Sequence, residues 1–170
     1  DGTTVPTSSS PVCTTVNVTS TTTVKAMASA SGYNDSGVVS GTYVIGSASG
    51  PAFVQSNTGL GGVAATLVAT AYAAAQTAGD LNVVVVGWSD STSSITSVID
   101  SNGNAYNLAV GPTKNTSGGI TQSIYYAKNI AAASAGANTV TVTFNTGAVF
   151  PDIRIFEYAG LSTTSPLDAT

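Results

Sequence analysis

Histidine is absent from this 170-residue chain, and cysteine occurs once, at Cys13. Histidine is the usual base beside a serine nucleophile and, with cysteine, the usual ligand of zinc, so both kinds of site are excluded. A single cysteine cannot form a disulfide within its own chain. We expect Cys13 to be a small buried residue or a free thiol, with an intermolecular disulfide as the alternative. The sequence predicts no cofactor.

Charge is also scarce, because charged residues make up 7% of the chain against about a quarter in typical soluble domains. The net charge is −4, and the four cations are scattered along the sequence. Nucleic acid is therefore excluded as a partner, since binding it requires a basic surface that neutralises phosphates. No apolar run approaches the roughly 18 residues of a membrane span. The cations are Lys25, Lys114, Lys128 and Arg154.

What the chain has in abundance is threonine, serine, glycine, alanine and valine, a composition typical of an extracellular β protein whose solubility comes from hydroxyl groups. It begins with Asp1 and shows no signal-peptide core, which favours a processed mature form or a fragment. We expect a secreted or cell-surface location. Asn-x-Ser/Thr triplets at Asn17, Asn34 and Asn115 are then candidate glycosylation sites.

The stretch Leu81–Trp88, LNVVVVGW, is too short for a buried helix and rich in β-branched residues, so it predicts a central strand buried on both faces. An antiparallel meander is expected after it. Asn-Gly within Asp100–Asn104 predicts a tight hairpin connection, and Gly111-Pro112 is expected to break a strand. The strands expected after Trp88 are Ile95–Ile99, Tyr106–Val110, Ile120–Lys128, Val140–Phe144 and Ile153–Tyr158.

Before this run, Phe53 and Val54 open a short predicted strand, and Gly59–Gly62 is a predicted loop. Ala65–Ala75 is rich in alanine, but its alternation favours a strand over a helix. Seven or eight short strands separated by turns predict an all-β fold. We expect an Ig-like β-sandwich, with a jelly roll as the alternative.

The chain divides into three predicted segments. Residues 1–24 form an extended N-terminal arm, in which a polar leader precedes a long strand over Val12–Val24 with one apolar face. Residues 25–50 form a connecting β segment that contains a strand at Val38–Ile45. Residues 51–170 form the sandwich.

A family resemblance accompanies the strand pattern. Its segments are PAFVQSN, AAAQTAGDLNVVVVGWSD, VIDSNGNAYNLAVGP, SIYYAKNI, NTVTVTFN and FPDIRIFEYAGLSTTSPLD. Over Pro51–Asp168 the chain resembles an Ig-like or jelly-roll module that recurs in large secreted and surface proteins of environmental bacteria. The resemblance implies fold and compartment but no activity. That module continues beyond the position of Pro166–Asp168, so the resemblance also implies that this sandwich lacks its final strands and exposes open edges and part of its core.

The acidic residues mostly fall in predicted turns, where aspartate bonds to nearby backbone amides. Asp90 and Glu157 are the pair that would have to flank a sugar in a glycosidase, and nothing in the sequence brings them together. Asp100–Asn104, DSNGN, resembles the start of a calcium loop but lacks its later glutamate, so hairpin chemistry is favoured. We therefore expect neither an enzyme nor a metal site.

The aromatic residues leave two possibilities open. Trp88, Tyr125, Tyr126 and Tyr158 would stack on sugar rings if they lined one exposed face. Trp88 follows four valines directly, which favours packing in the interior of a sandwich.

The N-terminal arm carries the functional hypothesis. Its strand-like pattern, in a chain whose sandwich is expected to be incomplete, predicts insertion into a neighbouring subunit by β-augmentation. Each subunit then gives and receives a strand, and the repeated contact builds a pilus-like homopolymer. One alternative is that the arm pairs within its own chain. Another is an adhesin or carbohydrate-binding module of a larger surface protein. The predicted donor residues are Val12, Thr14, Val16, Val18 and Val24.

Overall fold

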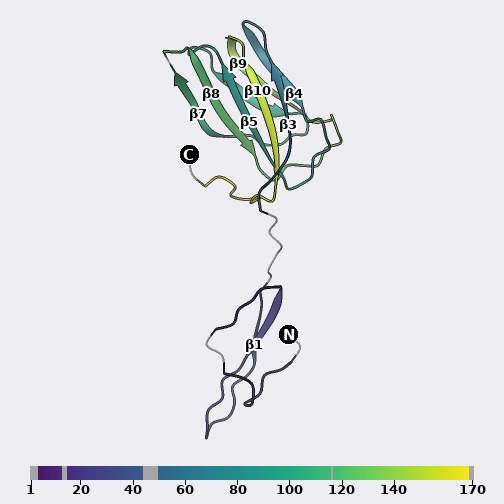
Figure 1. Cartoon of the computed structure of the whole chain (residues 1–170), viewed down its shortest axis with the longest axis vertical. Coiled ribbons are helices and arrows are strands. Elements are labelled where there is room, and N and C mark those ends of the chain that lie inside the picture. Colours follow the sequence, from purple (N-terminus) through teal and green to yellow (C-terminus); the bar gives the residue numbers. More distant parts are fainter. Residues whose placement is uncertain (1–3, 13–14, 44–49, 116, 169–170) are drawn as a thin grey trace. The chain divides into compact units, whose positions relative to one another are not determined.

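The computed structural model describes residues 4–12, 15–43, 50–115 and 117–168. The chain forms two compact units, Asp1–Ala48 and Ser49–Thr170, and each is described by itself. The described residues form ten strands and no helix (Figure 1). The prediction of an all-β fold is therefore confirmed.

The N-terminal unit contains one antiparallel pair, β1 (Thr22–Ala26) and β2 (Val39–Tyr43). The hydroxyls of Thr23 and Thr42 lie 2.9 Å apart across this pair. The predicted long strand over Val12–Val24 is wrong, because none of its described residues before Thr22 is in a strand. A strand requires a partner for its backbone hydrogen bonds, and the five residues of β2 pair with Thr22–Ala26 alone.

The C-terminal unit is a β-sandwich, which confirms that prediction. Its larger sheet has the order β3-β10-β5-β8-β7, and its smaller sheet the order β4-β9-β6 (Figure 1). The predicted central strand is β5, which lies between β10 and β8. The strands are β3 (Ala52–Leu60), β4 (Ala65–Ala71), β5 (Leu81–Trp88), β6 (Ile95–Asp100), β7 (Asn107–Asn115), β8 (Ile120–Ala127), β9 (Thr139–Ala148) and β10 (Asp152–Ala159).

Side chains from both sheets form the core between them. Val84, Val86 and Trp88 alternate along β5 and are buried, together with residues of β9 and β10. The rings of Trp88 and Phe144 meet edge to face at 5.3 Å, which confirms that Trp88 packs in the interior. Val83 and Val85 are half-buried on the opposite face of the sheet. The expectation that β5 is buried on both faces is therefore wrong.

The path after β5 differs from the predicted meander. β6 pairs with β9 in the smaller sheet, so Asp100–Asn104 connects two sheets instead of closing a tight hairpin. Gly103 has a φ of 77°, but Asn102 has no positive φ, whereas the expected hairpin turn requires both. Gly111-Pro112 lies inside β7, where the pairing with β8 shifts register without ending. Local turn residues do not determine which sheet receives the next strand.

The first strands of the sandwich also differ in length from the prediction. β3 is nine residues long and includes Gly59, which was expected to lie in a loop. A Cβ at Gly59 would lie 2.5 Å from the carbonyl oxygen of Ala69, so glycine permits β3 and β4 to approach closely there. β4 confirms a strand in the alanine-rich stretch but ends at Ala71.

Candidate assembly interface

The described part of the N-terminal unit contains no buried residue. Its best-covered segment is Thr22–Lys25 in β1, and these side chains are half-buried. All five residues of β2 are exposed. An isolated two-stranded pair is marginally stable in water, because it has no second layer to cover its apolar face. The described part of the unit therefore has apolar side chains but no core of its own.

The predicted donor residues occupy this poorly covered unit. Val12 is fully exposed and Val16 is 56% exposed. Val18 is half-buried, and Val24 is half-buried in β1 opposite Gly41. Thr14 lies outside the described residues, as does Cys13. The alternative that the arm pairs within its own chain is therefore realised as strand pairing for Thr22–Val24, and no described residue before them lies in a strand.

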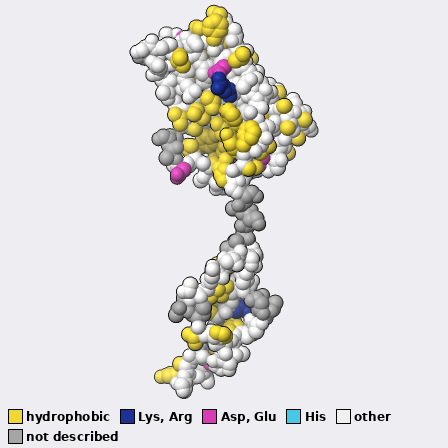
Figure 2. Space-filling model, viewed as in Figure 1, with side chains coloured by type: hydrophobic (Ala, Val, Ile, Leu, Met, Phe, Trp, Pro, Cys, Tyr) yellow, Lys and Arg dark blue, Asp and Glu magenta, His cyan; other side chains and the backbone are white. Residues whose placement is uncertain are grey.

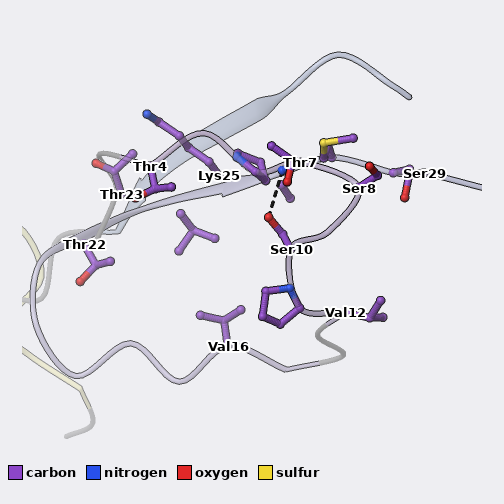
Figure 3. A pocket seen from close by; sticks show the side chains of 16 residues that line it. Thr4, Thr7, Ser8, Ser10, Val12, Val16, Thr22, Thr23, Lys25 and Ser29 are labelled. Atoms are coloured by element: carbon purple, nitrogen blue, oxygen red, sulfur yellow. Dashed lines mark hydrogen bonds between the residues drawn. The ribbon is translucent and has the colours of Figure 1, made fainter. Parts of the chain in front are cut away.

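The structure brings Val12, Val16 and Val24 together around one open groove of about 600 Å³. Figure 3 shows Val12 and Val16 on one side of it and the β1 residues Thr22 and Lys25 on another. Val12 and Val16 are exposed at this groove, so their side chains are accessible to another surface.

The sandwich has four edge strands, β3 and β7 in the larger sheet and β4 and β6 in the smaller. Its central interior is covered by its own strands, since Val84, Val86 and Ile155 are fully buried. The expectation that a neighbour must cover the interior of the valine run is therefore wrong. One flank is less complete: Leu108 of β7 lies opposite Tyr125 on the inner face and is 46% exposed. Edge strands of the sandwich therefore carry unpaired backbone groups, and one of them, β7, also carries an exposed apolar side chain.

Asp100 organises a buried polar network at the end of β6. Its Oδ2 accepts hydrogen bonds from Asn104 Nδ2 at 2.7 Å, Asn138 Nδ2 at 3.0 Å and the Tyr106 hydroxyl at 3.1 Å. Its Oδ1 accepts from the backbone amides of Asn104 and Asn102 at 2.9 and 3.2 Å. Burial and the Asp100 carboxylate raise the pKa of Tyr106. Both oxygens of Asp100 are thus bonded to donors, as predicted for a turn aspartate.

Glu157 is a fully buried carboxyl of β10. Its Oε2 accepts a hydrogen bond from Gln55 Nε2 at 2.6 Å, and its Oε1 accepts from the Thr77 amide at 3.2 Å. Burial and the neighbouring Glu157 raise the pKa of Asp80. These contacts join β10, β3 and the turn before β5. Sequence reasoning had not singled out Glu157 as a buried group.

Asp90 confirms the prediction of turn bonding. Its carboxylate accepts from the amides of Thr92 and Ser93 at 2.9 and 2.7 Å, and from the Val149 amide at 3.0 Å. Burial opposes its ionisation, but these hydrogen bonds outweigh that effect and lower the pKa of Asp90. Glu157 lies opposite the start of β5, whereas Asp90 follows its last residue. The structure therefore does not bring together the pair that a glycosidase would need.

The four aromatic residues considered as sugar platforms lie on two faces. Trp88 is in the core and Tyr125 packs against it. Tyr126 lies opposite Val83, and Tyr158 contacts Phe53 and Phe156, all on the outer face of the larger sheet. These four residues therefore do not form the single exposed face that sugar stacking would require.

The outer face of the larger sheet is apolar over its middle, a feature that sequence reasoning missed. Val83 and Val85 of β5 lie beside Ile124 of β8 and Phe156 of β10. Figure 2 shows hydrophobic side chains gathered over these strands, with a basic and an acidic side chain together at the border. The signal was present in the valine run, because alternate valines of one strand must point to opposite faces.

The three candidate glycosylation residues have exposed side chains, namely Asn17, Asn34 and Asn115. Asn115 Oδ1 accepts a hydrogen bond from the Gly118 amide at 3.0 Å. Their modification stays a prediction.

Within the described ranges, no helix is long and apolar enough to cross a membrane. Comparison with known proteins gives the chain no family, because no protein-family model, no curated protein and no solved structure matches it.

Proposed function

We propose that this chain is the structural subunit of an extracellular pilus-like filament. In this proposal residues 12–24 add as a strand to the sandwich of a neighbouring subunit. The observation that carries the proposal is the lack of any buried residue in the described part of the N-terminal unit, whereas the C-terminal unit has a buried core of its own.

Strand addition suits the chemistry of both surfaces. An edge strand offers unpaired backbone groups, and an incoming segment gains affinity from main-chain hydrogen bonds that do not depend on sequence. Val16 and Val18 alternate with polar residues, so one face of an added strand would be apolar. Leu108 of the edge strand β7 is 46% exposed, and an added strand could cover this apolar surface.

The repeated contact explains polymerisation without a second protein. A donor arm and an acceptor edge are different surfaces of one chain, so their contact is heterologous and continues from subunit to subunit. The scarcity of charge favours close packing of many copies. The secreted location, supported by the hydroxyl-rich composition, and the Ig-like type of the sandwich, supported by its short antiparallel strands in two sheets, are part of this proposal.

The test replaces apolar side chains of the arm with charged ones. Val16→Asp combined with Val18→Asp is expected to leave monomers, because two charges would have to enter an apolar contact. Light scattering over a concentration series and negative-stain images measure the outcome. The matched control, Asn17→Asp with Thr19→Asp, places equal charge on the polar side and should still polymerise. Expression in a host that adds no N-linked glycan removes the effect of these changes on Asn17.

Deleting residues 1–24 is a second test of strand donation. Loss of filaments, with monomers of poor solubility, is expected. Filaments at normal abundance after this deletion would disprove strand donation. A wild-type chain that stays monomeric at every concentration would instead favour the alternative, a module of a larger surface protein.

A further inference from the structure

A groove of about 390 Å³ crosses three neighbouring strands at one end of the larger sheet's outer face. Strand register explains its position, because Asp152 of β10 lies opposite Gly87 of β5, which lies opposite Gln122 of β8. Because Gly87 has no side chain, the surface is hollow between the carboxylate of Asp152 and the side-chain amide of Gln122. A Cβ at Gly87 would lie 2.7 Å from Asp152 Oδ1. The glycine thus makes room for the carboxylate over the floor of the groove.

The polar groups of the groove include donors and acceptors. Asp152 Oδ2 is bonded to Arg154, with Nη2 at 3.0 Å and Nε at 3.2 Å. Within the described part of the chain, Asp152 Oδ1 accepts no hydrogen bond, and the exposed Gln122 amide makes none. A ligand could therefore bond to a carboxylate oxygen, to remaining guanidinium hydrogens and to an amide within one site.

Apolar side chains also line the groove. Phe150 and Ile120 line the groove and are 58% and 53% exposed. Phe150 has a φ of 45°, a left-handed conformation that is costly for an aromatic residue. Such strain persists where the surrounding structure imposes it, and it occurs often at binding sites. Here the strained residue is an exposed aromatic side chain that lines the groove.

The charges in the groove cancel, because Arg154 and Asp152 neutralise each other. A net anionic or cationic ligand gains little there, whereas a neutral ligand with several hydroxyl groups matches both donors and acceptors. An exposed aromatic ring offers a surface for the apolar side of a sugar ring. We propose that this groove binds a neutral saccharide. The site lies on the sandwich alone and does not depend on strand donation by the N-terminal arm.

The test measures binding of the full chain by calorimetry to cellohexaose, laminarihexaose, mannohexaose and xylohexaose at millimolar concentration. Hexagalacturonic acid is the charged comparison. At least one neutral probe is expected to bind, and more tightly than the acidic one. Phe150→Ala should weaken that binding by about threefold to tenfold through loss of the aromatic contact. Gly87→Ala should also weaken it, because the new methyl displaces the Asp152 carboxylate.

Phe53→Ala is the matched control, since Phe53 is 59% exposed near the other end of β10 on the same sheet. It should bind as the wild type does. Circular dichroism of each variant verifies the fold, and if one variant is unfolded the other still tests the site. The proposal is overturned if no neutral probe binds, if the acidic probe binds better, or if both Phe150→Ala and Gly87→Ala leave affinity unchanged.

Discussion

The two units of this chain use the same small and hydroxyl-bearing residues, yet they differ completely in burial. In the sandwich, alternate residues such as Val84 and Val142 are fully buried between two sheets. In the N-terminal unit, Val24 is half-buried and Val16 is mostly exposed. The difference shows that an alternating pattern supplies an apolar face, but a second layer is needed to bury it.

This comparison also explains why the N-terminal unit is the place to look for assembly. Its β1–β2 pair has a register and a threonine–threonine contact, but no residue in the described part of the unit is buried. The free energy gained by covering its valines is still available, and another surface can provide the cover.

The largest expected effect comes from removing a core ring. Phe144→Ala should lower the free energy of unfolding by about 3–5 kcal/mol, because it deletes a buried ring and leaves a cavity beside Trp88. Tyr33→Ala, in the N-terminal unit, should change it by less than about 0.5 kcal/mol because Tyr33 is 81% exposed. Urea unfolding measures both, with the fluorescence of the single tryptophan reporting the sandwich and circular dichroism reporting the strands of both units. Equal effects would contradict the contrast between the units.

A buried carboxylate should give the next largest effect. Asp100→Ala is expected to cost roughly 2–4 kcal/mol, because the amides of Asn104 and Asn138 lose their buried acceptor. Asp35→Ala is the control in the N-terminal unit, where the side chain is exposed. Thermal unfolding compares the two variants. If Asp100→Ala lowers the stability no more than Asp35→Ala does, the hydrogen-bond network of Asp100 does not stabilise the sandwich.

A smaller effect depends on pH. The hydrogen bonds of Asp90 lower its pKa in the folded state, so its ionised form stabilises the fold above about pH 4, the ordinary aspartate value. That contribution is lost as the pH falls through the folded pKa. Asp90→Asn should cost about 1–2 kcal/mol at neutral pH and remove this part of the acid sensitivity. Unfolding curves from pH 7 to pH 3 test it, and an unchanged pH profile would contradict it.

The smallest free energies are those of local opening in the N-terminal unit. In monomers, the amides of β1 and β2 should exchange with solvent at opening free energies below about 1 kcal/mol, whereas those of β5 should approach the value for global unfolding. Hydrogen exchange measures both in one sample. Strong protection of β1 in monomers would show that this unit is stable alone, which would remove the main support for strand donation. Protection gained on assembly would strengthen it.

Part of this architecture was predictable from the sequence. The bounds of β5 and the interior position of Trp88 follow from a β-branched run ending in a large ring. The turn role of Asp90 follows from the affinity of aspartate for nearby amides. The failed strand over Val12–Val24 shows the limit of such reasoning, because alternation describes one segment and says nothing about a partner.

By itself, then, the sequence determined an all-β chain with a central valine strand, few charges and no histidine. Only the tertiary structure decided that β6 joins the smaller sheet, that the valine interior is covered by the chain's own strands, and that the N-terminal unit has no buried described residue. The tertiary structure also decided the groove at Gly87, since Gln122 and Asp152 are far from Gly87 along the chain. Strand register places these residues in one row, and register is a property of pairing between distant segments, which no local pattern contains.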